Sequence, residues 1–167
     1  MTETASPQYV WFPYAVPANK RIAQVYGWLF DHHGRVLIQE TAGGWNLPGG
    51  SPEDFDESSE ATLRREALEE SQVEIDDLAY LGYESGSHEN NAACTRYAGL
   101  IAGFRPRHAD PDGGALHGRW LVPLDEACRL LGWGEAGTRQ AAAAAAAAGS
   151  RWRLPVECPT AAAQHED

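Results

Sequence analysis

Apolar runs bounded by turn residues divide the first half of the chain into strands. The segments 21–30 (RIAQVYGWLF) and 35–40 (RVLIQE) are separated by Asp-His-His-Gly, whose aspartate and glycine are typical of a tight reversal. The segments 78–85 (LAYLGYES) and 95–104 (TRYAGLIAGF) have a similar composition. We therefore predict that these four segments are strands.

The pattern becomes helical after residue 57. Leu63 and Ala67 lie four residues apart, which places both on a helix face that can pack against a sheet. Ser58 or Asp56 can cap the first turn, where acidic residues are favourable. The sequence therefore predicts a helix that begins at about Ser58.

The last third of the chain predicts a short strand and two helices. Residues 117–123 (HGRWLVP) form the strand, and residues 124–133 (LDEACRLLGW) form a helix with acids in its first turn. Residues 135–150 include eight consecutive alanines, which have the highest helix propensity, and a low-complexity segment is the alternative. The order of strands, long helix, strands and two helices predicts an α/β (α+β) fold with helices packed on one mixed β-sheet.

The chain is expected to form one globular domain. It has 167 residues, of which 43% are hydrophobic and 10% aromatic, which is enough to build a core. We place the domain at residues 21–150. Residues 1–20 are expected to be an extended N-terminal arm that lies on the domain, and residues 151–167 a C-terminal tail.

Composition argues against several classes of protein. The net charge is −11 and no run of Lys or Arg occurs, so we expect no binding to duplex nucleic acid. The sequence has no stretch of 18 apolar residues and no signal peptide, so we expect no membrane span.

Three widely spaced cysteines (Cys94, Cys128 and Cys158) are typical of reduced thiols in a cytoplasmic protein. Twelve Arg against one Lys suggest a GC-rich bacterial genome.

Acidic residues are concentrated in one segment. Eleven of them lie between Glu53 and Asp77, against two bases, Arg64 and Arg65, which gives 2 − 11 = −9 within a net charge of −11. A solvent-facing acidic surface that aids solubility is one explanation. A site for a divalent cation is the other.

Three of these acids share one face of the predicted helix. Glu66, Glu69 and Glu70 stand at positions i, i+3 and i+4, within about 100° of one another around the helix. Such like charges disfavour an isolated helix by roughly 0.2–0.5 kcal/mol per pair. Mg²⁺ or Mn²⁺ would turn this repulsion into ligation, because both prefer oxygen ligands.

Two glycines, Gly49 and Gly50, immediately precede the loop into this helix. Residues without a side chain let the backbone approach a phosphate closely, or offer a carbonyl group to a metal. A turn with no function is the alternative.

The residues from Gly50 to Val73 resemble the signature of the Nudix hydrolase family. That signature is a glycine, five residues, a glutamate, seven residues, and then Arg-Glu-apolar-x-Glu-Glu-x-Gly-apolar. Here Gly50 is the glycine, Glu57 the first glutamate, and the run REALEESQV from residue 65 the last part. The flanking sequences WNLPGG and RWLVPL also match, so the resemblance covers roughly residues 20–150.

The chain departs from this signature at two positions. Six residues rather than five separate Gly50 from Glu57. Gln72 replaces the family glycine, which usually permits a left-handed turn at the end of the helix, so the exit toward Val73 could be strained or reshaped.

The resemblance implies a fold and a reaction. The fold is the family's α/β/α sandwich, and the reaction is Mg²⁺-dependent (or Mn²⁺-dependent) hydrolysis of a pyrophosphate linkage. The substrate would be a small-molecule nucleotide or nucleotide derivative, and a homodimer is frequent in the family. A Nudix-fold regulatory module that binds a nucleotide without hydrolysing it is the alternative.

The resemblance also implies roles for individual residues. The implied metal ligands are Glu66 and Glu70, with Glu69 as a further ligand or the catalytic base, and a carbonyl group of Gly49 or Gly50. Arg65 would pair with Glu57 or with a ligand carboxylate and hold it in position, and is counted with Glu66 and Glu69 as catalytic.

Other candidates remain open. Many family members take a further carboxylate from a later loop, and the candidates here are Glu84, Glu89, Asp110 and Asp112. Arg105, Arg107, His108 and Arg119 could contact phosphates, and Trp28, Trp45 or Trp120 could stack on a base, although surface and core positions are the ordinary explanations. The substrate-binding residues are not identified by the sequence.

Overall fold

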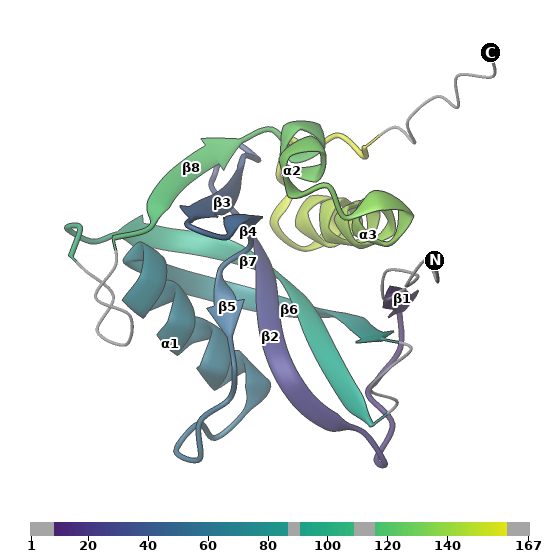
Figure 1. Ribbon diagram of the computed structural model, residues 1–167. Helices are drawn as coiled ribbons and strands as arrows, with labels where there is room; N and C mark the ends of the chain where they lie inside the picture. Colours follow the sequence, from purple (N-terminus) through teal and green to yellow (C-terminus); the bar gives the residue numbers. More distant parts are fainter. Residues whose placement is uncertain (1–8, 87–90, 109–115, 160–167) are drawn as a thin grey trace, which may run out of the picture.

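The computed structural model describes residues 9–86, 91–108 and 116–159 (Figure 1). Its strands are β1 (Tyr9–Phe12), β2 (Arg21–Phe30), β3 (Val36–Thr41), β4 (Gly44–Asn46), β5 (Gly49–Gly50), β6 (Val73–Gly86), β7 (Ala92–Phe104) and β8 (Gly118–Val122). Its helices are α1 (Ser59–Ser71), α2 (Leu124–Leu131) and α3 (Gly134–Trp152). All the predicted strands and helices are present, and β6 begins at residue 73 rather than 78.

The strands form one mixed sheet in the order β1-β6-β7-β2-β3-β4, with β5 paired to β2 and β8 paired to β3. β2 and β7 run parallel, and the other pairs are antiparallel. Among the described residues, β2 and β3 pair at a single position, Phe30 with Val36, beside the turn that joins them. The two strands therefore separate further along, where β2 pairs instead with β5.

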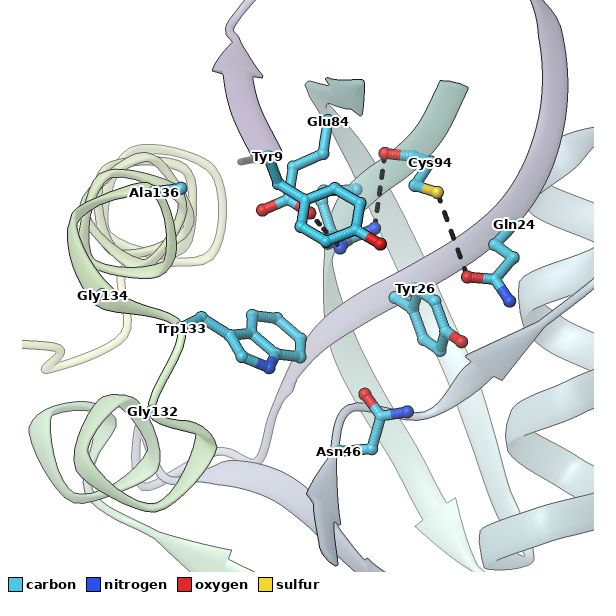
Figure 2. A pocket seen from close by; sticks show the side chains of 11 residues that line it. Tyr9, Gln24, Tyr26, Asn46, Glu84, Cys94, Gly132, Trp133, Gly134 and Ala136 are labelled. Carbon is cyan, nitrogen blue, oxygen red and sulfur yellow. Dashed lines mark hydrogen bonds and ion pairs between the residues drawn. The ribbon is translucent and has the colours of Figure 1, made fainter. Parts of the chain in front are cut away.

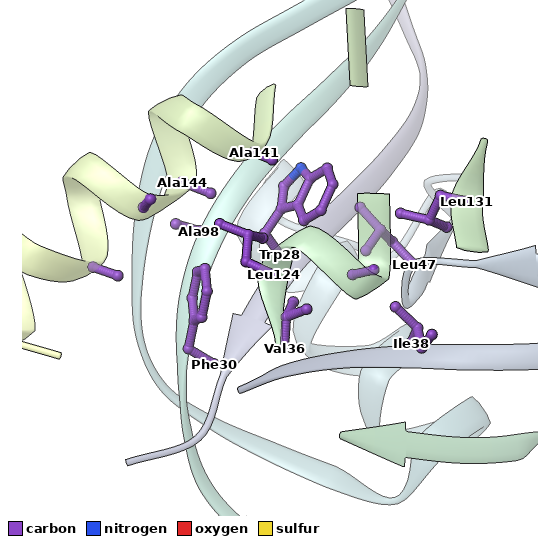
Figure 3. Packing of buried hydrophobic residues seen from close by; sticks show 13 residues of the cluster. Trp28, Phe30, Val36, Ile38, Leu47, Ala98, Leu124, Leu131, Ala141 and Ala144 are labelled. Carbon is purple, nitrogen blue, oxygen red and sulfur yellow. The ribbon is translucent and has the colours of Figure 1, made fainter. Parts of the chain in front are cut away.

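Helices cover both faces of this sheet, with α1 on one face and α2 and α3 on the other (Figure 1). Alternate residues of a strand point to opposite faces, so β2 contributes to two cores. Its Val25 and Leu29 pack with Leu63 of α1, and its Trp28 and Phe30 pack in a second cluster beside α3 (Figure 3). This arrangement confirms the predicted α/β/α sandwich.

The alanine run forms most of α3. Ala141, Ala144 and Ala148 are fully buried in the same cluster as Trp28. Their small side chains let the helix lie close to the strands, so the run is a packed helix and not a low-complexity segment. Neither α3 nor any other helix within the described ranges is long and apolar enough to cross a membrane.

The N-terminal arm contributes a strand to the sheet. β1 pairs antiparallel with β6 at the sheet edge, where Trp11 is 5% exposed and the Phe12 ring stacks on Tyr83 with centroids 5.0 Å apart. Gly82 permits this contact, because a Cβ atom there would lie 2.3 Å from the carbonyl oxygen of Phe12. The sequence indicated an extended arm but not its pairing.

Gln72 ends α1 in the left-handed conformation that glycine usually supplies, with φ 51° and ψ 49°. Its side chain is fully buried, its Nε2 donates to the carbonyl oxygen of Glu69 at 2.9 Å, and its Oε1 accepts from Arg107 at 2.9 Å. The helix exit is therefore not reshaped by the missing glycine. The side-chain hydrogen bonds offset a backbone conformation that costs about 1–2 kcal/mol in a residue with a Cβ atom.

We expect Gln72→Ala to destabilise the protein more than Gln72→Gly. Both changes remove the same two hydrogen bonds, at about 1 kcal/mol each, but only glycine relieves the left-handed backbone, which is worth roughly 1 kcal/mol. Urea unfolding of the three proteins measures the difference. Equal stabilities of the two variants would show that the left-handed conformation carries no cost here.

Candidate functional site

The acidic face of α1 lies against the backbone of the Gly49–Gly50 pair. Gly49 has φ +152°, and a Cβ atom there would lie 2.0 Å from the carbonyl oxygen of Val25 in β2. A Cβ atom at Gly50 would lie 2.6 Å from Cδ of Glu66. The absence of both side chains therefore lets β5 pair with β2 while the Glu66 carboxylate reaches its backbone.

The Arg65 guanidinium contacts three carboxylates. Its Nη1 donates to Glu66 at 2.9 Å and to Glu69 at 3.1 Å. Its Nε and Nη2 donate to the two carboxylate oxygens of Asp56 at 3.0 and 2.9 Å. Because a two-pronged pair of this kind fixes orientation as well as distance, Arg65 holds Glu66 and Glu69 at a set position relative to the loop before α1.

The partner that this loop supplies to Arg65 is Asp56, not Glu57. Asp56 also accepts from the Thr62 hydroxyl and from the backbone N–H of Glu53, both at 2.9 Å, and its side chain is 4% exposed. Glu57 is exposed, and no ion pair in the described part of the chain includes it. Of the two partners expected for Arg65, Glu57 or a carboxylate predicted to bind the metal, the structure shows the second, in Glu66 and Glu69.

With Asp56 as the loop partner of Arg65, the one residue that the chain has in addition to the family signature falls after this acid. Five residues separate Gly50 from Asp56, which is the spacing of the family signature, and eight rather than seven separate Asp56 from Arg65. The departure therefore lies at the start of α1, and an aspartate replaces the longer glutamate. The spacing between Gly50 and the first loop acid is preserved, whereas the acidic helix face lies one residue further from Gly50 than in the signature.

Glu66 and Glu70 lie one turn apart on α1, close enough for Glu70 to act on the pKa of Glu66. Gln39 of β3 donates to Glu70 at 2.7 Å and to the Ser71 hydroxyl at 2.8 Å. Burial raises the pKa of Glu66, and the charge of Glu69 adds to this, while Arg65 opposes it. A raised carboxyl pKa shows that burial and like charge outweigh the neighbouring cation, so this cluster favours a further positive charge.

The residues present fit a divalent cation. Glu66, Glu69, Glu70 and the Gly50 backbone provide oxygen donors of the kind that Mg²⁺ and Mn²⁺ prefer. No group of three or more acidic, histidine or cysteine side chains in the described ranges is arranged as a preformed metal cluster, and Arg65 instead contacts two of the three carboxylates. The structure thus brings the predicted ligands together, and their roles stay predictions.

A pocket of about 610 Å³ lies between the strands and the α2–α3 connection (Figure 2). Aromatic and amide side chains line much of it: Tyr9, Gln24, Tyr26, Asn46 and Trp133. The volume lies within the range of small-molecule sites.

Tyr26 connects this pocket with the acidic face of α1. Burial raises the pKa of Tyr26, while the Asn46 side chain lies close enough to its hydroxyl to lower this pKa. The charges of Arg96 and Glu70 act on the pKa of Tyr26 in opposite directions. Arg96 lines the pocket and Glu70 belongs to α1, so Tyr26 lies within reach of the charges of both.

A buried ion pair joins three elements at the pocket. Arg96 of β7 donates to Glu84 of β6 at 3.0 Å and to Gln140 of α3 at 3.0 Å, and Gln140 also donates to Glu84. The Arg96 guanidinium also lies over the rings of Tyr26 and Trp133, 5.0 and 5.4 Å from their centroids. This network ties α3 to the sheet and fixes two aromatic walls of the pocket.

Glu84 was predicted as a loop carboxylate that could complete the metal site, and the structure corrects this. It lies in β6, 8% exposed, and its carboxylate is engaged by Arg96 and Gln140. Glu84 therefore belongs to the pocket wall. The other candidates, Glu89, Asp110 and Asp112, lie outside the described residues.

The basic residues proposed for phosphate contact are engaged within the protein. Arg105 pairs with Glu74, while Arg107 and Arg119 donate to the carbonyl oxygen of Ser71 at the end of α1, at 3.4 and 2.8 Å. His108 is exposed. Arg107 and Arg119 thus place two cations near the acidic face of α1, where they complement the carbonyl groups of the helix end.

The tryptophan that lines the pocket is Trp133, which the sequence did not single out. Of the predicted candidates, Trp28 is fully buried in the core, and Trp45 and Trp120 contact each other edge to face at 6.3 Å. Trp133, Arg96 and Tyr9 come from three distant segments. No local motif marks them, so only the folded chain brings them together.

An α/β/α sandwich with an acidic helix beside a glycine pair defines the class to which this chain belongs. A model of the NUDIX domain matches residues 20–144, which is most of the chain. The chain therefore belongs to the NUDIX family.

Solved structures share this fold. The Bacillus subtilis pyrophosphohydrolase BsRppH has a TM-score of 0.58 and 20% identity, over 68% of this chain and 72% of that chain. A NUDIX hydrolase from Nitrosomonas europaea has a TM-score of 0.53 and 20% identity, over 68% of this chain and 80% of that chain. A comparison with curated protein sequences finds no significant match.

We expect Asp56→Asn to lower the free energy of unfolding at pH 7 by about 2 kcal/mol, because hydrogen bonds to charged groups contribute roughly 1.5–3 kcal/mol. Glu57→Gln is the matched control, and it should change the free energy by less than about 0.5 kcal/mol because the residue is exposed. Urea unfolding measures both. An equal effect of the two substitutions would contradict the Arg65–Asp56 assignment.

The effect of Asp56→Asn should also depend on pH. The Arg65 hydrogen bonds hold the pKa of Asp56 well below its ordinary range. Its stabilising contribution is therefore complete above the ordinary aspartate value of about 3.9 and falls as the pH drops toward the lower folded value, since the unfolded chain then binds the proton first. Unfolding measured from pH 7 to pH 3 should show the difference between wild type and variant shrinking below about pH 4.

Proposed function

We propose that this chain is a Mg²⁺-dependent hydrolase that cleaves a pyrophosphate linkage in a nucleotide or nucleotide derivative. One observation carries the proposal: in a NUDIX family member, Glu66, Glu69 and Glu70 lie together on α1, with Glu66 against Gly50. The B. subtilis protein of similar fold is a pyrophosphohydrolase, which supports this reaction class. A cytoplasmic location, a bacterial origin and a homodimer remain predictions.

The proposed roles follow from the charges of the site. A pyrophosphate resists water because its own negative charge repels a nucleophile. Glu66 and Glu70 would hold Mg²⁺, which would supply the positive charge needed to neutralise the diphosphate and stabilise the leaving oxygen. Glu69 is 26% exposed at its side chain, so it can accept a proton from the water that attacks phosphorus. Arg65 positions Glu66 and Glu69 and acts through them.

The pocket beside the split in the sheet would hold the rest of the substrate. Its aromatic and amide side chains suit a nucleoside better than a second phosphate group. Tyr26 and Asn46 line the pocket, and the charge of Glu70 acts on Tyr26. A nucleotide can then lie with its diphosphate at α1 and its nucleoside in the pocket.

Glu70→Gln should lower turnover at least about 100-fold, as expected when a group that stabilises transition-state charge is lost. The substitution removes the charge but keeps hydrogen-bonding atoms for Gln39. Glu60→Gln is the matched control, because Glu60 is an exposed acid in the first turn of the same helix, and it should retain turnover. Full activity of Glu70→Gln would contradict its role as a ligand.

A substrate screen tests the reaction itself. Nucleoside triphosphates, dinucleotides, ADP-ribose and sugar nucleotides are incubated with the protein and Mg²⁺, and the products are separated by chromatography. We expect cleavage of a pyrophosphate bond in at least one of them, abolished by EDTA and restored by excess Mg²⁺ or Mn²⁺. Tight nucleotide binding without cleavage of any compound would instead favour the regulatory-module alternative.

A further inference from the structure

The pocket has one wall from outside the segment that matches the NUDIX domain. The match begins at residue 20, whereas Tyr9, in the first strand of the described structure, lines the pocket. In Figure 2 the Tyr9 side chain projects from β1 into the same space as Trp133 and Tyr26. The wall formed by Tyr9 therefore lies outside the segment of this chain that matches the NUDIX domain.

Tyr9 is held at the pocket by the strand that carries it. β1 pairs with β6 from Tyr9 opposite Gly86 to Phe12 opposite Tyr83. Because residues that face each other across two strands share a side of the sheet, Tyr9 lies on the side of Gly86. The ring uses the space that Gly86 leaves, since a Cβ atom there would lie 3.2 Å from Cε1 of Tyr9.

The anchor of β1 is separate from Tyr9. Trp11 is 5% exposed and the Phe12 ring stacks on Tyr83, whereas Tyr9 is 56% exposed. Tyr9 therefore contributes little to the burial that fixes the strand. Its exposed ring is available to a ligand.

The charges around the pocket indicate what that ligand is. Arg96 and Glu84 are paired with each other, and Nη1 of Arg96 also donates to the carbonyl oxygens of Cys94 and Thr95 at 3.3 and 3.2 Å. This pair contributes no net charge to the pocket. Three aromatic rings and two amide side chains then favour a planar, uncharged group with hydrogen-bonding edges over a phosphate or an aliphatic group.

We propose that Tyr9 is a specificity-determining residue whose ring stacks on the nucleobase of the substrate. The inference rests on the proposed function for the identity of the ligand as a nucleotide, and it adds a residue outside the NUDIX domain to the binding site. Tyr9 acts on affinity for the base and has no part in the chemistry at α1.

The test is binding, to the 167-residue chain, of nucleotides in which a methylene group blocks cleavage of the α,β linkage. The α,β-methylene analogues of ATP, GTP, CTP and UTP are titrated in the presence of Mg²⁺ by calorimetry, with tripolyphosphate as the ligand that lacks a base. We expect Tyr9→Ala to weaken the best-bound analogue about 10-fold, within the range measured when an aromatic residue that stacks on a base is replaced by alanine. Its affinity for tripolyphosphate should be unchanged.

Two variants control for structure. Tyr9→Phe keeps the ring and should bind like the wild type. Val10→Ala alters the next residue, 49% exposed and on the opposite side of β1, and should also bind like the wild type. Thermal unfolding of all variants should give unchanged transition temperatures, since the anchors at Trp11 and Phe12 remain.

Three results would overturn the inference: Tyr9→Ala binding the analogues as tightly as the wild type, an equal loss of affinity for tripolyphosphate, or a wild type that binds none of the four analogues. The proposed function fails separately. Base-dependent binding that is sensitive to Tyr9, in a protein that hydrolyses no nucleotide, would support this inference and contradict the hydrolase.

Discussion

The close approach of the Gly49–Gly50 backbone to β2 on one side and to Glu66 on the other is the constraint on which the site depends. β5 pairs with β2 at Val25 and Tyr26, where β3 has already separated from β2. A side chain at Gly49 would collide with the β2 backbone, and one at Gly50 with the Glu66 carboxylate. The same two residues thus keep the sheet split and bring its backbone to the acidic helix. The separation of β2 from β3 and the position of the Glu66 carboxylate therefore both depend on the glycine pair.

Two networks of ion pairs on either side of the sheet differ in how far their charges are balanced. On the α1 side, Arg65 contacts three carboxylates, and burial still raises the pKa of Glu66. On the α3 side, Arg96 is matched by Glu84, and Gln140 completes the hydrogen bonding of both. Because an unpaired buried charge is costly whereas a paired and hydrogen-bonded one is tolerated, the second network is complete as it stands. The first is the one that further positive charge would stabilise.

The sequence was informative wherever the evidence is local. The spacing of Glu66, Glu69 and Glu70 fixes them on one helix face, and apolar runs and turn residues locate the strands and helices. Of the two alternatives left open for Arg65, the contact with helix carboxylates is present, but the loop partner is Asp56 and not Glu57, because the path of a loop decides which of two adjacent acids faces a helix. The pocket could not be predicted at all. Tyr9, Arg96 and Trp133 are far apart in the chain, and only the pairing of β1 with β6 and the packing of α3 bring them together.

The position of Tyr26 explains how a split sheet can join two chemically different sites. Its backbone pairs with Gly49 of β5, so the glycine pair that seats Glu66 also fixes Tyr26. Its ring lies under the Arg96 guanidinium, and the charge of Glu70 also acts on its hydroxyl. Tyr26 therefore contacts the neutral pocket and also lies within range of the negative charge of α1. A molecule with an anionic end and an aromatic end is complementary to that order of charge, and a uniformly charged or uniformly apolar molecule is not.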